Sequence, residues 1–61
     1  MEYFEITIFD VKSGLKTYDF DRKCTKVNHK DDHYIICKTD GDTALALFPH
    51  NIVMSIIRKE D

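Results

Sequence analysis

The stretch that decides the fold runs from Asp32 to Ile57 and reads DHYIICKT-DG-DTALALFP-HNIVMSII. Two dense apolar runs flank the dipeptide Asp40-Gly41, and a third run follows a corner marked by Pro49. An Asp-Gly pair between apolar runs is a strong hairpin signal, because both central positions of a type I′ turn need a positive φ. The stretch therefore predicts an antiparallel β-hairpin followed by one more strand.

The chain is short, and its length limits what it can stabilise. Its 61 residues make one small domain, residues 1–61. Such a chain buries only about 60% of the surface that its unfolded form exposes, so its stability is marginal. A composition that is 43% hydrophobic and 33% charged is typical of a globular domain. The domain therefore needs a staple, a metal, a partner or very good packing.

Composition also indicates a compartment. The chain has no run of about 18 apolar residues, which predicts no membrane span. Its first residues, MEYFEITIF, have neither a basic leader nor a small-residue cleavage site. Two cysteines without a secretory signal favour reduced thiols. We therefore expect a cytoplasmic protein, which includes one made inside a cell by a virus or a mobile element.

A first hairpin is predicted before the deciding stretch. Residues 3–11 alternate and are rich in β-branched and aromatic types, which favours a strand. Residues 12–14 are predicted as a three-residue turn with Gly14 in the left-handed region, and residues 15–21 as the second strand. This register is favoured because it places apolar side chains opposite each other: Val11 with Leu15, Ile8 with Tyr18, and Ile6 with Phe20.

Four further strands are predicted from the same rules. Residues 24–27 form a short third strand, and a turn over residues 29–32 pairs Val27 with Tyr34 and Cys24 with Cys37. Strands four and five cover residues 33–39 and 42–48. Turning at the Asp-Gly pair matches Ile36 with Leu45, Tyr34 with Leu47, and Cys37 with Ala44.

The chain after Pro49 is predicted to turn once and then extend. Proline cannot donate to a ladder, so strand five ends near Phe48, and His50-Asn51 form one turn of 3₁₀ helix. Residues 52–58 then make strand six, with a helix over residues 52–60 as the alternative. The charged residues 59–61 are expected to fray.

The cysteines and histidines form the first candidate for chemistry. Cys24, His29, His33 and Cys37 have the spacing C-x4-H-x3-H-x3-C, and thiolate and imidazole are ligands of tetrahedral zinc. The set lacks a Cys-x-x-Cys pair, and the predicted register keeps His29 far from both cysteines. We therefore expect no metal and no cofactor, with one cysteine buried and one exposed. A zinc site and a cross-strand disulfide are the alternatives.

No pattern indicates catalysis. Asp19 and Asp21 share a strand face that points away from the aromatic residues, so a solvated outer surface is expected. The chain has no nucleophile elbow, and its two glycines form no phosphate-binding loop. We expect no catalytic residues and no enzymatic activity.

The order of strands, with an Asp-Gly hairpin and a single-turn corner before the last strand, resembles SH3-like barrels, including Sm-like RNA-binding proteins. The stretch Leu47–Ile56, LFPHNIVMSI, looks like the end of such a barrel. In Sm-like chaperones a lysine-histidine pair at this corner contacts RNA. His50 matches the histidine, whereas Pro49 stands in place of the lysine, and the N-terminal helix of that family is absent. The chain also resembles, in style, short β proteins of Gram-positive bacteria and their phages.

Pattern and resemblance together predict an all-β fold: a small antiparallel SH3-like barrel or bent meander of five to six strands. One set of side chains is expected to fill its core: Phe4, Ile6, Ile8, Tyr18, Phe20, Ile36, Leu45, Leu47, Ile52 and Ile56.

Strands four to six are apolar on both faces, which a one-sided antiparallel sheet is not. A second apolar face needs a cover, so we expect a homo-oligomer, most simply a dimer, or a protein partner. The candidate partner-binding residues are Phe9, Ile35, His50, Val53 and Ile57.

The expected function is a small non-enzymatic protein-interaction module, a regulator or inhibitor of a larger protein. The alternative is an Sm-like nucleic-acid-binding domain, with aromatic side chains as stacking platforms. The net charge of −2 argues against nucleic acid as a partner.

Overall fold

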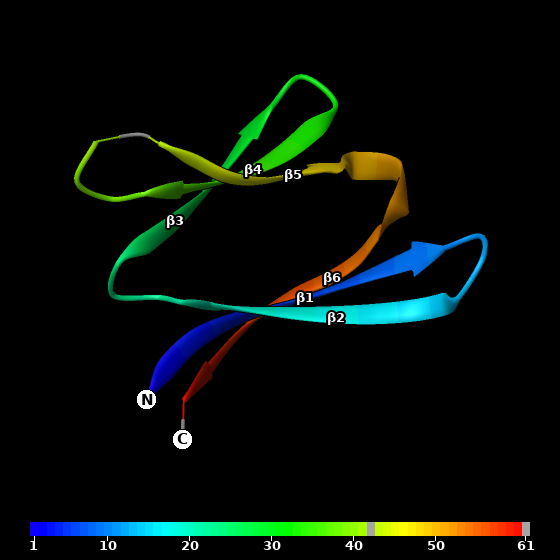
Figure 1. Ribbon diagram of the computed structural model, residues 1–61, viewed down its shortest axis with the longest axis horizontal. Helices are drawn as coiled ribbons and strands as arrows, with labels where there is room; N and C mark the ends of the chain where they lie inside the picture. Colours follow the sequence, from blue (N-terminus) through cyan, green and yellow to red (C-terminus); the bar gives the residue numbers. More distant parts are fainter. Residues whose placement is uncertain (42, 61) are drawn as a thin grey trace.

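The computed structural model describes residues 1–41 and 43–60. It contains six strands in two three-stranded antiparallel sheets, sheet 1 with the order β2-β1-β6 and sheet 2 with the order β3-β4-β5 (Figure 1). The elements are β1 (Glu2–Asp10), β2 (Gly14–Asp21), β3 (Thr25–Lys30), β4 (His33–Lys38), β5 (Ala44–Pro49), the 3₁₀ turn η1 (His50–Ile52) and β6 (Val53–Glu60). The predicted all-β antiparallel fold of five to six strands is confirmed, but over the described residues the two sheets do not close into a barrel.

The core lies between the two sheets. Ile6 and Ile8 of β1 meet Ile36 of β4 and Phe48 of β5, and all four are buried. Partly buried apolar side chains surround this cluster: Phe20, Val27, Ala46, Ile52, Val53 and Ile56. We call the face of each sheet that contacts this cluster the inner face and the opposite one the outer face.

The β1–β2 hairpin has the predicted faces but a different register. Asp10 lies opposite Gly14, so residues 11–13 form the turn and the predicted pair Val11–Leu15 is wrong. The carboxylate of Asp10 accepts a hydrogen bond of 2.8 Å from the backbone N–H of Lys12, which begins the turn before Val11. The observed register differs from the predicted one by two residues. Because side chains alternate between the faces of a strand with a period of two, every side chain stays on its predicted face of the sheet.

Gly14 has a φ of 78°, as the sequence predicted. Its replacement by valine is expected to lower the free energy of unfolding by about 1–2 kcal/mol, because a β-branched residue is strained in the left-handed region. Thermal melts of Gly14→Val and Gly41→Val test this. A Cβ at either position meets nothing within 4 Å, but only Gly14 has a positive φ. Equal melting temperatures for the two variants would contradict the expectation.

The β4–β5 hairpin contains the main departure from the predicted register. Cys37 lies opposite Ala44 as predicted, but a bulge follows, and Ile36 then lies opposite Ala46. The predicted strand start at residue 42 lies outside the described residues. A one-residue shift moves a strand's side chains to the other face. Leu45 and Leu47 are therefore 46% and 57% exposed, and the prediction that they fill the core is wrong.

The β3–β4 hairpin also differs from prediction by two residues. Val27 lies opposite Ile36 rather than Tyr34, and Asp31 and Asp32 alone form the turn. Asp31 has a φ of 55°, which aspartate tolerates better than most residues do. His29, predicted in the turn, therefore lies within β3.

Three predictions about the end of the chain can be settled. The single 3₁₀ turn at His50 is confirmed, and a strand follows it, so the helical alternative is wrong. The predicted fraying is wrong for Lys59 and Glu60, which pair with Tyr3 and Glu2 of β1. Lys59 also forms an ion pair of 3.4 Å with Glu5, and residue 61 is outside the described part of the chain.

Candidate interaction surface

The five predicted partner-binding residues do not form one surface. The register puts Phe9 near one end of the outer face of sheet 1 and Ile57 near its middle, opposite Glu5. It puts Ile35 on the outer face of sheet 2. His50 lies in η1, the turn that connects β5 of sheet 2 to β6 of sheet 1. Val53 lies opposite Ile8 and packs against the core, so it supports the fold rather than a surface.

The outer face of sheet 2 carries an apolar group that the prediction identified only in part. Ile35 of β4 lies directly opposite Leu47 of β5, and Leu45 is exposed at the adjoining bulge. We call Ile35, Leu45 and Leu47 the β4–β5 strip. Lys26 and Lys30 lie on β3 at positions of the same face. Sequence reasoning assigned both leucines to the core, because ALALF is apolar in either register.

His50 contributes to a second cluster, made of three rings. The His29 and Tyr34 rings stack with centroids 4.6 Å apart, and the His50 ring lies 5.6 Å from His29 and 6.2 Å from Tyr34. A hydrogen bond of 2.7 Å from the His50 N–H to the carbonyl of Asp32 ties η1 to the β3–β4 turn. The sequence indicated His50 alone, because the pairing of His29 with Tyr34 depends on a register that it did not predict.

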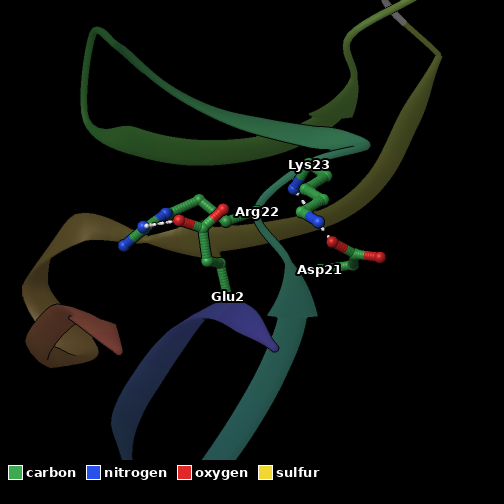
Figure 2. Close-up of polar contacts among 4 residues, drawn as sticks. All are labelled: Glu2, Asp21, Arg22 and Lys23. Carbon is green, nitrogen blue, oxygen red and sulfur yellow. Dashed lines mark hydrogen bonds and ion pairs between the residues drawn. The ribbon is translucent and has the colours of Figure 1, made fainter. Parts of the chain in front are cut away.

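The corner between β2 and β3 is held by charged residues (Figure 2). The Arg22 guanidinium lies 3.0 Å from the Glu2 carboxylate, and the Arg22 N–H donates to the Glu2 carbonyl over 3.1 Å. The Asp21 carboxylate accepts a hydrogen bond of 2.9 Å from the Lys23 N–H. These contacts fix where the chain leaves sheet 1 for sheet 2.

The same aspartate makes the neighbouring cysteine a poor nucleophile. The Cys24 thiol lies 3.4 Å from the Asp21 carboxylate and donates to it. This hydrogen bond and the nearby negative charge raise the pKa of the Cys24 thiol. Reactive cysteines depend on the thiolate form, so this environment opposes nucleophilic chemistry at Cys24.

Asp21 should make stability depend on pH in acid. Hydrogen bonds, first from the Lys23 N–H and then from the Cys24 thiol, lower the pKa of the Asp21 carboxyl. A lowered pKa in the folded state means that the stabilisation is complete above the unfolded-state pKa of about 3.9 and is lost as pH falls through the folded-state pKa. We expect the melting temperature of Asp21→Asn to fall less than that of the wild type as the pH is lowered from about 4, close to that reference value, to about 2.5.

Asp19→Asn is the control, because the described residues give Asp19 no hydrogen bond or ion pair. It should follow the wild-type curve. Identical curves for Asp21→Asn and the wild type would contradict the assignment.

The zinc-like spacing does not gather into a site. Cys24 is exposed and Cys37 is buried, and both are free, as the sequence predicted. Cys37 instead accepts a contact of 3.7 Å from the Asn28 amide. Within residues 1–41 and 43–60, no group of three or more His, Cys, Asp or Glu side chains is arranged to hold a metal ion. No helix in this part of the chain is long and apolar enough to cross a membrane.

Comparison with known proteins found no matching family model, no matching curated protein and no matching solved structure. The function must therefore be inferred from the surface of the protein itself.

Proposed function

We propose that this protein is a small non-enzymatic interaction module that regulates or inhibits a larger protein by docking on it through the β4–β5 strip. The observation that carries the proposal is the bulge after Ile36, which turns Leu45 and Leu47 from the core to the surface. A domain of marginal stability gains nothing by itself from exposing two leucines. Contiguous exposed apolar side chains are typical of a protein-binding surface.

The residues around the strip indicate the chemistry of the partner. Lys26 and Lys30 lie on the same face, one strand away from Ile35. A complementary surface would offer apolar side chains to Leu45 and Leu47 and carboxylates along its rim. The proposed partner is therefore a protein with an apolar site bordered by acidic residues.

The proposal includes an SH3-like fold class. The single 3₁₀ turn between the last two strands supports this assignment. The free state of Cys24 and Cys37 supports action in a reducing cytoplasm.

Matched variants test the docking surface. Wild type, Leu47→Lys and Val11→Lys are immobilised, and proteins captured from an extract of the source organism are identified by mass spectrometry. Val11 is the control, because it is an exposed apolar residue in the β1–β2 turn, away from the strip. We expect a protein that wild type and Val11→Lys retain and Leu47→Lys loses. Its purified form should bind Leu47→Lys at least about tenfold more weakly, a loss of about 1.4 kcal/mol. Equal binding by all three would contradict the proposal.

The ring cluster favours an Sm-like nucleic-acid binder as the second candidate. The His29 and Tyr34 rings stack, the His50 ring lies tilted beside them, and bases stack on aromatic side chains. The net charge of −2 offers few phosphate contacts, whose counterion release drives most of such binding.

We therefore expect no anisotropy change when labelled poly-U is titrated at about 0.15 M salt, where charges are screened as in cells. Micromolar affinity that falls steeply with salt and is lost in His50→Ala would favour the second candidate instead.

A further inference from the structure

The outer edge of β2 presents unpaired backbone groups. β2 is the edge strand of sheet 1, and within the described residues it pairs only with β1. The Arg22 N–H donates to the Glu2 carbonyl, and bonded pairs alternate along an antiparallel ladder. The even-numbered residues of β2 therefore bond to β1. The 3.4 Å contact between the Thr7 and Thr17 hydroxyls agrees, because non-bonded pairs bring side chains closest.

It follows that the N–H and C=O groups of Leu15, Thr17 and Asp19 point away from the sheet. Residues 15–19 of β2 are all exposed, so nothing in the described chain covers this edge. Exposed edge strands are templates for pairing with another strand, and proteins usually protect them.

The other three edges are short, bulged or shifted in register, whereas β2 carries charged side chains but has none of these interruptions. β5 contains a bulge and ends at Pro49, which has no N–H. β6 has a register shift against β1, and its last residues are charged. β3 is six residues long and carries three lysine or histidine side chains on alternating faces. β2 has eight residues, no proline and an unbroken register from Tyr3↔Asp21 to Asp10↔Gly14.

We infer that the free edge of β2 pairs with β2 of a second copy of this chain. The two strands run antiparallel about a two-fold axis, with Thr17 opposite Thr17 of the second copy, and the two copies of sheet 1 join into one sheet. A two-fold axis perpendicular to the sheet keeps the inner faces of both copies on the same side. Odd-numbered residues of one β2 therefore pair with odd-numbered residues of the other, and even-numbered with even-numbered. This is the isologous contact typical of homodimers.

In this register the side chains of β2 are compatible with those of β2 in the second copy. Lys16 lies opposite Tyr18 of the second copy, and Leu15 opposite Asp19, so no like charges are directly opposed. The two Lys16 side chains are diagonal neighbours, but each has Asp10 at 3.5 Å as a counter-ion. The alternative register with Tyr18 opposite Tyr18 of the second copy would make the two Asp19 side chains diagonal neighbours. The described residues supply no counter-ion to Asp19.

The positions of an exposed leucine and of a hollow along β2 support the second copy as the occupant. Leu15 is 65% exposed, and pairing brings it level with a hollow of about 230 Å³ at the other end of the second copy's β2. Met1, Tyr3, Asp19, Phe20 and Asp21 line this hollow. By symmetry each copy supplies one leucine and one hollow.

Light scattering of wild type, Thr17→Lys and Thr7→Lys at about 10–100 µM tests the inference at affinities of roughly 5–7 kcal/mol. Thr7 is the matched control: it lies on the same outer face, directly opposite Thr17, but on the central strand. We expect a dimer mass for wild type and Thr7→Lys and a monomer mass for Thr17→Lys, all with unchanged circular dichroism. A monomeric wild type, or a dimer that Thr17→Lys preserves, would overturn the inference. So would a dimer that is lost in Leu47→Lys instead, which would place the contact on the β4–β5 strip.

A disulfide trap keeps the inference testable if Thr17→Lys fails to fold. Directly opposed residues of a bonded pair have Cα atoms about 5.5 Å apart, within the range that a disulfide spans. In a Cys24→Ser background, mild oxidation should convert Thr17→Cys into a covalent dimer. Asp19→Cys should stay monomeric under the same oxidation, since it lies opposite Leu15 rather than itself. Equal cross-linking of both variants, or of neither, would contradict the register.

Discussion

Replacing Ile36 by alanine is expected to lower the free energy of unfolding by about 2–5 kcal/mol, as large-to-small changes in cores do. Ile36 is 0% exposed and lies at the centre of sheet 2, between Val27 of β3 and Ala46 of β5. Neither neighbour is large enough to fill the space that the truncation leaves. Total stabilities of native proteins are about 5–15 kcal/mol, so this single change should remove a large share of the stability of the domain.

Leu47→Ala is the informative control for this prediction. Leu47 lies on the strand next to Ile36, but the bulge turns it to the outer face. Its truncation should change stability by about 0.5 kcal/mol or less, the usual size for surface positions. Urea unfolding followed by circular dichroism measures both variants. A loss for Leu47→Ala as large as that for Ile36→Ala would mean that β5 has the unbulged register, with both predicted leucines in the core.

Replacing Phe48 by alanine is expected to lower the free energy of unfolding by about 3–5 kcal/mol. Phe48 is buried, and its ring centroid lies 5.5 Å from that of Tyr18 and 6.3 Å from that of Phe20. These contacts join β5 of sheet 2 to β2 of sheet 1, so the truncation removes packing between the sheets as well as buried area. Aromatic pairs of this kind add about 0.5–1.5 kcal/mol beyond the area they bury.

Phe9→Ala provides the matched aromatic control. Phe9 is 48% exposed on the outer face of sheet 1 and has no ring partner among the described residues. Calorimetric melts should show a large fall in melting temperature for Phe48→Ala and a small one for Phe9→Ala. If both variants melted alike, the sheets would have to be held together by contacts other than this ring.

Much of the fold could be predicted from the sequence, because its signals are local. Alternation identified the strands, Gly14 marked the left-handed position, and Pro49 marked the turn at His50. The hairpin registers were harder to predict from the sequence. In β1–β2 and β3–β4 the predicted pairing is wrong by two residues, because a short side-chain hydrogen bond or a two-residue turn decides where a loop begins. An error of two leaves every face unchanged, which is why Ile6, Ile8 and Ile36 are buried as predicted, although Tyr18, also predicted in the core, is 38% exposed.

The candidate surface could be predicted only in part. Ile35 was identified because both faces of β4 are apolar. Leu45 and Leu47 were assigned to the core, because a bulge has no clear sequence signal in a run whose residues are all apolar. The free edge of β2 was equally hidden, since the order of strands in a sheet depends on contacts between distant segments.

The sequence by itself determined the order of the six strands along the chain, the approximate places of the turns between them and the presence of more apolar surface than a small domain can bury. Only the tertiary structure decided which apolar residues of β5 face inward. The ring of Phe48 packs against Tyr18 and Phe20 and fills the space between the two sheets. The bulge lets that ring reach the core while Cys37 stays opposite Ala44. Because side chains alternate along a strand, placing Phe48 inside necessarily places Leu47 outside.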